Sequence, residues 1–310
     1  MKTEKEINVE MVRMEGDLAP FVMVDYMDKD AHEHSGLLLL DTGSTVNILS
    51  PEMANHIGSL SKLDEKATIS AFGPDVMDAD LVKFSFALGG IQFHETFCLS
   101  NRKFPCSVVG MKVLGLLGNP FMQLHNLVLD YSNYTLHTSK ISPDNLSISD
   151  CSFFFPMEIG LKHYGLPVIS VSQNEKELVT MVDTGASTNM ISSQALAENH
   201  FKHERLDGND FIKNITGNVE ADKAKVWFSM LSLATNDVCK ITRKDLFYIL
   251  PYNVTTPEED DCDSDGNQLP PIEVVIGSPF MAKERWILDF GAKIMYKLKA
   301  TKLKPETLFL

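Results

Sequence analysis

The chain has 310 residues, a length that fits one large domain or two medium ones. Hydrophobic residues make up 44% of it, so it can build packed cores and does not have the composition of a disordered protein. A formal net charge of -14 disfavours nucleic acid and anionic membranes as partners, and no apolar run reaches the roughly 18–20 residues that span a bilayer.

The N-terminal residues and the cysteines indicate in which cellular compartment the protein is expected. Residues 1–6 lead into no apolar stretch like that of a signal peptide. The five cysteines are scattered, without a Cys-x-x-Cys pair, and suit reduced thiols better than a disulfide framework. We therefore expect a cytoplasmic protein.

In the first half, apolar runs predict strands that lead into a tight turn. Residues 21–27 and 37–40 have the pattern of strands, and the second run enters Asp41-Thr42-Gly43, where glycine suits the turn. Ser50 as N-cap, followed by Pro51, predicts a short helix over residues 51–57. A hairpin over residues 67–86, with Phe72 and Gly73 at its turn, follows.

The second half repeats this order after a linker over residues 138–152, which is rich in Ser, Asn, Asp and Pro. The expected elements are strands over 168–172 and 178–182, a helix over 193–199 that Ser192 opens, and a hairpin over 211–230 that turns near Gly217. Residues 255–271 read as a solvated acidic loop.

Two ordered sequence blocks occur twice. Asp41-Thr42-Gly43-Ser44, preceded by leucines, has a counterpart 142 residues later in Asp183-Thr184-Gly185-Ala186. Leu116-Leu117-Gly118 has a counterpart 159 residues later in Val275-Ile276-Gly277. Two matches in the same order are implausible by chance, so we predict two copies of one mostly β unit, residues 1–148 and 149–310.

A pair of aspartates on two such turns suits one kind of chemistry. Two carboxyl groups about 3 Å apart cannot both ionise, so they share a proton. One is then a base at the pH where the other is still an acid, which is what hydrolysis by an activated water requires. Asp41 and Asp183 are therefore the candidate catalytic residues.

These motifs resemble those of the aspartic peptidases of the pepsin and retropepsin group, and look most like a fused tandem of bacterial retropepsin-like domains. The resemblance implies a mostly β, two-lobed acid-protease fold with pseudo-two-fold symmetry. It implies an endopeptidase that needs no cofactor or metal, acts on peptide or protein substrates, and works as a monomer because both catalytic halves are in one chain.

The resemblance also implies roles for the neighbours of the two aspartates. Thr42 and Thr184 would interlock beneath the pair, and Ser44 would hydrogen-bond the Asp41 carboxylate. The remaining residues of the two catalytic loops would support them, and both hairpin tips would act as flaps over the substrate. These residues are Gly43, Gly185 and Ala186 for the loops, and Phe72, Gly73, Ile215, Thr216 and Gly217 for the flaps.

Two departures from the pepsin pattern favour a fused retropepsin-like dimer over a true pepsin relative. No tyrosine stands where a pepsin-like flap would have one, and both halves, although each is larger than a minimal retropepsin subunit, have a hairpin that could be a flap. Because a fold does not imply a function, the alternative is a catalytically silent peptide-binding or assembly protein that uses the same cleft.

Two further patterns hint at metals. Residues 261–266 match the start of a calcium loop, but its twelfth position is Ile272 rather than glutamate, so we interpret the stretch as an acidic loop. His32 and His34 are two residues apart with no further ligand nearby in the sequence, so we interpret them as part of a loop that leads into a strand.

Overall fold

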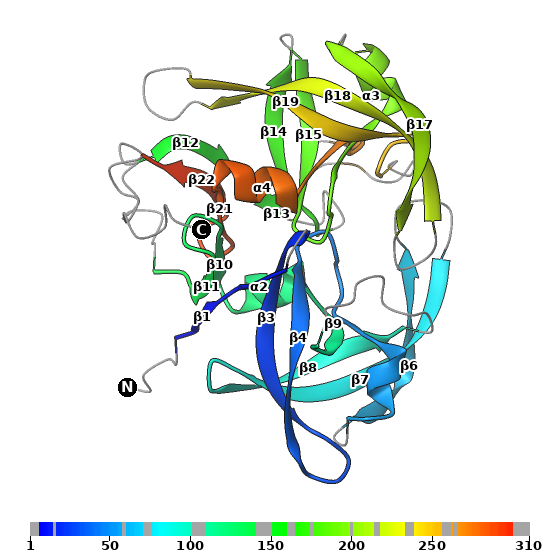
Figure 1. The fold of residues 1–310 in the computed structure, drawn as a ribbon, viewed down its shortest axis with the longest axis vertical. Helices are drawn as coiled ribbons and strands as arrows, with labels where there is room; N and C mark the ends of the chain where they lie inside the picture. Colours follow the sequence, from blue (N-terminus) through cyan, green and yellow to red (C-terminus); the bar gives the residue numbers. More distant parts are fainter. Residues whose placement is uncertain are drawn as a thin grey trace.

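The structure is a computed structural model that describes residues 6–14, 17–57, 60–70, 76–100, 110–140, 151–159, 165–173, 176–198, 201–213, 218–232, 239–255, 262 and 266–299. Within these ranges the chain is mostly β, as predicted, and forms three sheets (Figure 1). No helix in the described part of the chain is long and apolar enough to cross a membrane.

The first eight-stranded sheet, in the lower half of Figure 1, contains only residues that precede Asn119. In spatial order its strands are β2 (Val12–Met14), β3 (Asp17–Met27), β4 (Glu33–Asp41), β9 (Val113–Gly118), β5 (Ile48–Leu49), β8 (Ile91–Leu99), β7 (Val76–Leu88) and β6 (Ser61–Ser70). Strands β4 and β9 are parallel, and their register sets Asp41 beside Gly118.

The second eight-stranded sheet repeats this arrangement with later residues. Its strands, in the equivalent order, are β13 (Glu158–Ile159), β14 (Pro167–Gln173), β15 (Lys176–Asp183), β20 (Val274–Gly277), β16 (Asn189–Ser192), β19 (Cys239–Leu250), β18 (Asn218–Ser232) and β17 (His203–Lys213). Strands β15 and β20 are parallel and set Asp183 beside Gly277. The sequence repeat is therefore also a repeat of strand order.

The third sheet joins the two halves. Its six strands, in spatial order, are β1 (Asn8–Glu10), β11 (Thr135–Thr138), β10 (Leu127–Asp130), β21 (Ile287–Asp289), β22 (Ile294–Leu298) and β12 (Cys151–Pro156). The central pair, β10 and β21, is antiparallel. Read from the two edges inward, β1, β11 and β10 of the first half correspond to β12, β22 and β21 of the second half. This arrangement indicates an approximate two-fold axis between β10 and β21.

The expected participation of the C-terminal strand in this sheet is confirmed, since β22 pairs with β12. The expected linker is too long at both ends. Cys151 and Ser152 belong to β12, where Cys151 is buried and lies opposite Leu298, and Thr138 ends β11. The division between residues 148 and 149 falls outside the described residues.

Each half has two short helices rather than the one expected. They are α1 (Pro51–Ala54), α2 (Asn119–Leu124), α3 (Ser193–Glu198) and α4 (Ser278–Glu284). The sequence interpretation missed α2 and α4 because six or seven residues show little periodicity, although Pro120 and Pro279 occupy the favoured first turn. Helix α1 ends at Ala54, three residues before the expected end.

The two predicted helix starts differ in their capping. Ser50 has the N-cap position of α1, but its side chain makes no capping bond. Ser192 accepts a bond of 3.0 Å from the Ala195 N–H at the start of α3. Only the second serine therefore satisfies a free donor of the first turn.

The largest core cluster includes buried side chains from both halves. Leu38 and Leu40 on β4, Val182 on β15 and Leu288 on β21 are all 0% exposed. Full burial of such a side chain stabilises the fold by roughly 1.5–3 kcal/mol. The strands that end in Asp41 and Asp183 are thus anchored in one core.

Candidate active site

Asp41 and Asp183 lie at equivalent strand ends and face each other across the approximate two-fold axis. Each is the last residue of its strand, and a tight turn follows. Asp183 is buried and Asp41 is partly buried. The fold thereby brings together two residues that are 142 positions apart in the sequence.

The two turns interlock through their threonines. The hydroxyl of Thr42 donates to Val182 O at 2.6 Å and accepts from the Thr184 N–H at 2.9 Å. The hydroxyl of Thr184 donates to Leu40 O at 2.6 Å and accepts from the Thr42 N–H at 3.1 Å. Both side chains are fully buried, so these four bonds tie each turn to the opposite half without competition from water.

Glycine after each threonine leaves room for the opposite carboxyl group. A Cβ at Gly43 would lie 2.5 Å from Cγ of Asp183, and a Cβ at Gly185 would clash with Cγ of Asp41. Contacts this short do not occur with real side chains. Both glycines are therefore required by the approach of the two aspartates, which extends the predicted loop-support role.

The carboxyl groups of Asp41 and Asp183 lie close enough for each to act on the pKa of the other. Burial raises the pKa of Asp41 well above its usual value, and the Asp183 charge raises it further. Burial also raises the pKa of Asp183, while the N–H groups of Gly185 and Ala186, at 2.9 and 3.1 Å from Oδ1, oppose the rise. Two charges on so close a pair are unfavourable, so we expect the pair to share one proton.

The expected bond from Ser44 to Asp41 is not formed by the serine hydroxyl. The hydroxyl donates its single proton to Val46 O at 2.7 Å, within its own turn. The backbone N–H of Ser44 faces the Asp41 carboxylate instead and lowers its pKa. The backbone of Ala186 supplies the same kind of donor to Asp183, and for this contact the side chain is not needed.

Two asparagines that the sequence interpretation did not single out hold the neighbouring glycines. Oδ1 of Asn47 accepts from the Gly118 N–H at 2.9 Å, and Oδ1 of Asn189 accepts from the Gly277 N–H at 3.0 Å. A Cβ on either glycine would lie 2.5 Å from a backbone oxygen, Val46 O or Thr188 O. The conserved offset between Asn47 and Asn189 in the two copies was the signal that could have found them.

The residue after each of these glycines also braces one of the two aspartate turns. Nδ2 of Asn119 donates to Ser44 O at 3.1 Å, and the Ser278 hydroxyl donates to Thr184 O at 2.6 Å. The hydroxyl of Tyr131, from the first half, lies 2.9 Å from the Ser278 Oγ. Different side chains thus perform equivalent tasks in the two halves.

Several predicted site residues cannot be placed. The proposed flap residues Phe72, Gly73, Ile215, Thr216 and Gly217, and most of the calcium-like stretch 261–266, lie outside the described residues. The strands on either side of both hairpin tips are present, as β6 with β7 and β17 with β18. A hollow of about 400 Å³ lies beside α1 and β7, and none of its lining residues belongs to the two aspartate turns.

Neither aspartate belongs to a group of potential metal ligands in the described part of the chain. Such groups occur only around Asp28, at the opposite end of the β3–β4 hairpin.

In comparisons with known proteins, no family model and no curated protein matches this chain. The arguments that follow rest on the residues and their geometry.

Proposed function

We propose that this chain is an aspartic endopeptidase in which Asp41 and Asp183 act together on a water molecule and a peptide bond. The observation that favours this most is the close approach of the two carboxyl groups at the centre of the interlocked turns. A pair of acids with only a structural role would be unfavourable, because burying a charge lowers the stability of the fold unless other interactions compensate.

We further infer the two-lobed acid-protease architecture. Two sheets of equivalent strand order, a joining sheet whose order is the same from either edge, and aspartates at equivalent strand ends all favour it. In this architecture residues 1–148 and 149–310 are the two lobes.

The proposed reaction has two steps and no covalent enzyme intermediate. The ionised carboxylate takes a proton from the water molecule while the oxygen of that water attacks the peptide carbonyl carbon. The protonated carboxyl group donates its proton to the carbonyl oxygen, which gives a neutral tetrahedral diol. The carboxyl group that took the water's proton then gives it to the amide nitrogen. The other carboxylate takes a proton from a diol hydroxyl as the C–N bond breaks, so the pair again holds one proton in its starting arrangement.

The interlocked threonines fix the distance between the two aspartate turns, on which proton transfer depends. Proton transfer requires heavy-atom distances of roughly 2.6–3.2 Å to the reacting groups. Bonds from Thr42 and Thr184 to the backbone of the opposite half fix the spacing of the two turns before substrate binds. The catalytic groups are thus preorganised, which lowers the cost of reaching the transition state.

A diverse peptide library incubated in ¹⁸O-labelled water tests the proposal. We expect cleaved peptides in which the new C-terminal carboxyl group holds one ¹⁸O atom, and no mass adduct on the protein. The control is the double variant Asp41→Asn/Asp183→Asn, which keeps the size of both side chains and should cleave nothing.

The alternative is a peptide-binding or assembly protein without turnover. Binding of library peptides by the wild type, with no cleavage from about pH 3 to pH 8, would favour this alternative and contradict the peptidase proposal.

A further inference from the structure

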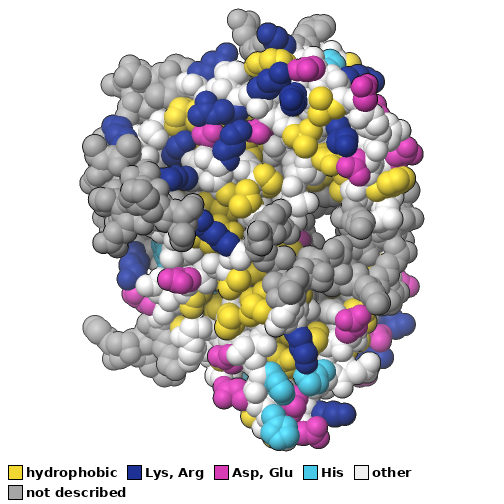
Figure 2. Space-filling view, in the orientation of Figure 1, with side chains coloured by type: hydrophobic (Ala, Val, Ile, Leu, Met, Phe, Trp, Pro, Cys, Tyr) yellow, Lys and Arg dark blue, Asp and Glu magenta, His cyan; other side chains and the backbone are white. Residues whose placement is uncertain are grey.

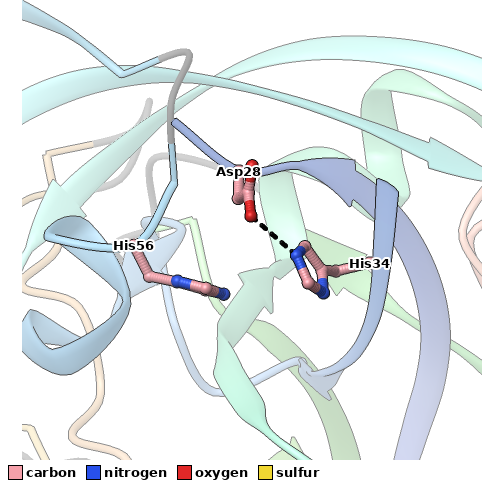
Figure 3. Close-up of side chains that lie close together, drawn as sticks. All are labelled: Asp28, His34 and His56. Atoms are coloured by element: carbon pink, nitrogen blue, oxygen red, sulfur yellow. Dashed lines mark hydrogen bonds and ion pairs between the residues drawn. The ribbon is translucent and has the colours of Figure 1, made fainter. Parts of the chain in front are cut away.

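A second cluster of ionisable side chains lies far from the aspartate pair, at the turn between β3 and β4. Figure 3 shows Asp28, His34 and His56 approaching one another from separate segments. Oδ2 of Asp28 lies 2.8 Å from Nε2 of His34, and one ligand atom from each of the three residues falls within 4.8 Å of the others. In Figure 2, histidine side chains gather at this lower end of the molecule.

The backbone holds these three residues in place. The turn closes with a 2.9 Å bond from the Asp28 N–H to His32 O. A bridge between Asp28 and Ile57, with a 3.2 Å bond from the Lys29 N–H to His56 O, attaches the segment that follows α1. His56 is therefore fixed next to Asp28 although 28 residues separate them.

Asp28 is prepared as a ligand. Its side chain is 8% exposed, and Oδ1 accepts the N–H groups of Asp30 and His32 at 2.8 and 2.9 Å. These bonds orient the carboxylate and leave Oδ2 directed at His34. A cation at Oδ2 would replace the proton that the carboxylate and the imidazole now share.

An independent observation at the same place is the hydroxyl of Tyr26. This side chain is 2% exposed, and its oxygen is buried without a hydrogen-bond partner among the described residues. Its ring lies 5.8 Å from the His34 ring and 6.2 Å from the His56 ring, and the charge of Asp28 acts on its hydroxyl. A buried polar atom without a partner is rare, and it indicates a bound water or ion at the cluster.

We propose that Asp28, His34 and His56 bind a divalent transition metal, with Zn²⁺ as the best match. Two imidazole nitrogens and one carboxylate oxygen are ligands that zinc prefers, and a water completes four-coordination. Tetrahedral ligand atoms lie about 3.4 Å apart. Asp28 Oδ2 and His34 Nε2, now 2.8 Å apart, therefore need to separate by about 0.6 Å, and the His56 ligand atom, within 4.8 Å of both, needs to approach by at most about 1.4 Å. The half-buried His34 and His56 side chains can supply these shifts.

The proposed metal has a structural role. His34 and Asp41 are both on β4, and seven residues of extended strand place them about 23 Å apart. The metal would connect the β3–β4 turn to the segment after α1, and would take no part in the reaction of the aspartate pair. The proposal therefore does not depend on the proposed peptidase activity.

The ammonium group of Lys112 competes with a metal ion for His56. Its Nζ lies 3.0 Å from Nε2 of His56, and the ammonium group donates to that nitrogen. The side chain is exposed and can move away, but its positive charge opposes a divalent cation. Removing this charge in Lys112→Met should strengthen metal binding.

The test is titration of the full-length protein with Zn²⁺ by calorimetry, and with Co²⁺ by visible absorption, which reports tetrahedral coordination. We expect one site per chain, a raised melting temperature with Zn²⁺, and at least a tenfold higher Kd in His34→Gln and in His56→Gln. Lys112→Met should lower the Kd. The matched control is His94→Gln, an exposed histidine of the same half that bonds the Ser85 hydroxyl, and it should bind as the wild type does.

Two results would overturn the proposal. One is the absence of saturable binding near one equivalent at micromolar protein. The other is binding that survives in His34→Gln and His56→Gln as it does in His94→Gln, which would assign the metal to other ligands such as the cysteines. Both histidine variants keep the Asp28 turn bonds, so the fold is expected to persist.

Discussion

The two aspartate turns have the same residues where each turn contacts the opposite half, and they differ at the position that follows. Thr42 and Gly43 have the same residue types and the same contacts as Thr184 and Gly185, and each of these contacts reaches the opposite half. In contrast, Ser44 is replaced by Ala186, and its hydroxyl bonds only within its own turn. The comparison teaches that the shared aspartate pair constrains the residues that cross the two-fold axis and leaves the others free to diverge.

The histidine cluster extends this contrast. Asp28, His34 and His56 contact only their own half, and among the described residues no such group occurs in the second half. A feature that serves one half alone does not need to be duplicated. Matched substitutions at equivalent positions of the two halves therefore test whether the halves depend equally on these residues.

The largest effect is expected from the aspartates. Asp41→Asn and Asp183→Asn should each lower kcat/KM by at least about 10³-fold, because each removes one partner of the acid–base pair. The two losses should agree within about tenfold, and circular dichroism should show both variants folded. A variant that retained wild-type activity would remove its aspartate from the mechanism.

Next in size is the loss of stability at the braced glycines. In Gly118→Ala and Gly277→Ala the new Cβ would lie 2.5 Å from a backbone oxygen, so each should cost about 3 kcal/mol in the free energy of unfolding, measured with urea.

The control is Gly165→Ala, where φ is +75° but nothing lies within 4 Å of the Cβ. It should cost only about 1 kcal/mol, since the strain there is that of the left-handed backbone alone. Equal costs at all three positions would show that the close approach to Val46 O and Thr188 O is not what requires glycine.

Smaller losses are expected at the interlocked threonines. Thr42→Val keeps the side-chain shape but leaves Val182 O and the Thr184 N–H without their partners, and Thr184→Val is its mirror image. Each should cost about 2 kcal/mol of stability and reduce activity less than loss of an aspartate does. Unequal thermal unfolding of the two variants would break the proposed equivalence of the halves.

The smallest effect concerns pH and stability. Folding raises the pKa of Asp41, so the folded state binds the proton more tightly than the unfolded chain. This contribution favours the fold below the unfolded-state pKa of about 3.9 and is lost as pH rises through the folded-state pKa. Asp41→Asn should therefore be more stable than the wild type near pH 7.5, by on the order of 1 kcal/mol.

Near pH 3.5 the advantage of Asp41→Asn should shrink, because the wild-type pair is then protonated. Urea midpoints at the two pH values provide the measurement. A constant difference between the variant and the wild type would mean that the buried pair does not hold the unfavourable charge.

Sequence reasoning predicted the part of this molecule that local residue patterns determine. The repeated Asp-Thr-Gly segments predicted which residues pair, and the apolar runs before them predicted strands. The short helices α2 and α4 were missed because periodicity needs longer segments, although Pro120 and Pro279 were visible signals. The resemblance predicted a bond from Ser44 to Asp41, which the Ser44 backbone makes, but it did not predict that the hydroxyl bonds Val46 O instead.

Contacts between segments that are distant in the sequence were the other part of the structure that could not be predicted. Nothing in the sequence connects His56 with His34, because their proximity depends on the bridge between Asp28 and Ile57. Asn47 and Asn189 share the offset of the repeat, but their role as acceptors depends on β9 and β20 lying beside the aspartate strands. The roles of the two hairpin tips as flaps stay predictions.

The most direct test of the shared-proton pair is the pH dependence of kcat/KM for the wild-type protein on one cleaved peptide, from about pH 3 to pH 8. The account predicts a bell-shaped profile, because activity requires one proton on the pair and is lost when Asp41 and Asp183 are both protonated or both ionised. A profile without a limb on one side, or a rate that does not change with pH, would contradict it.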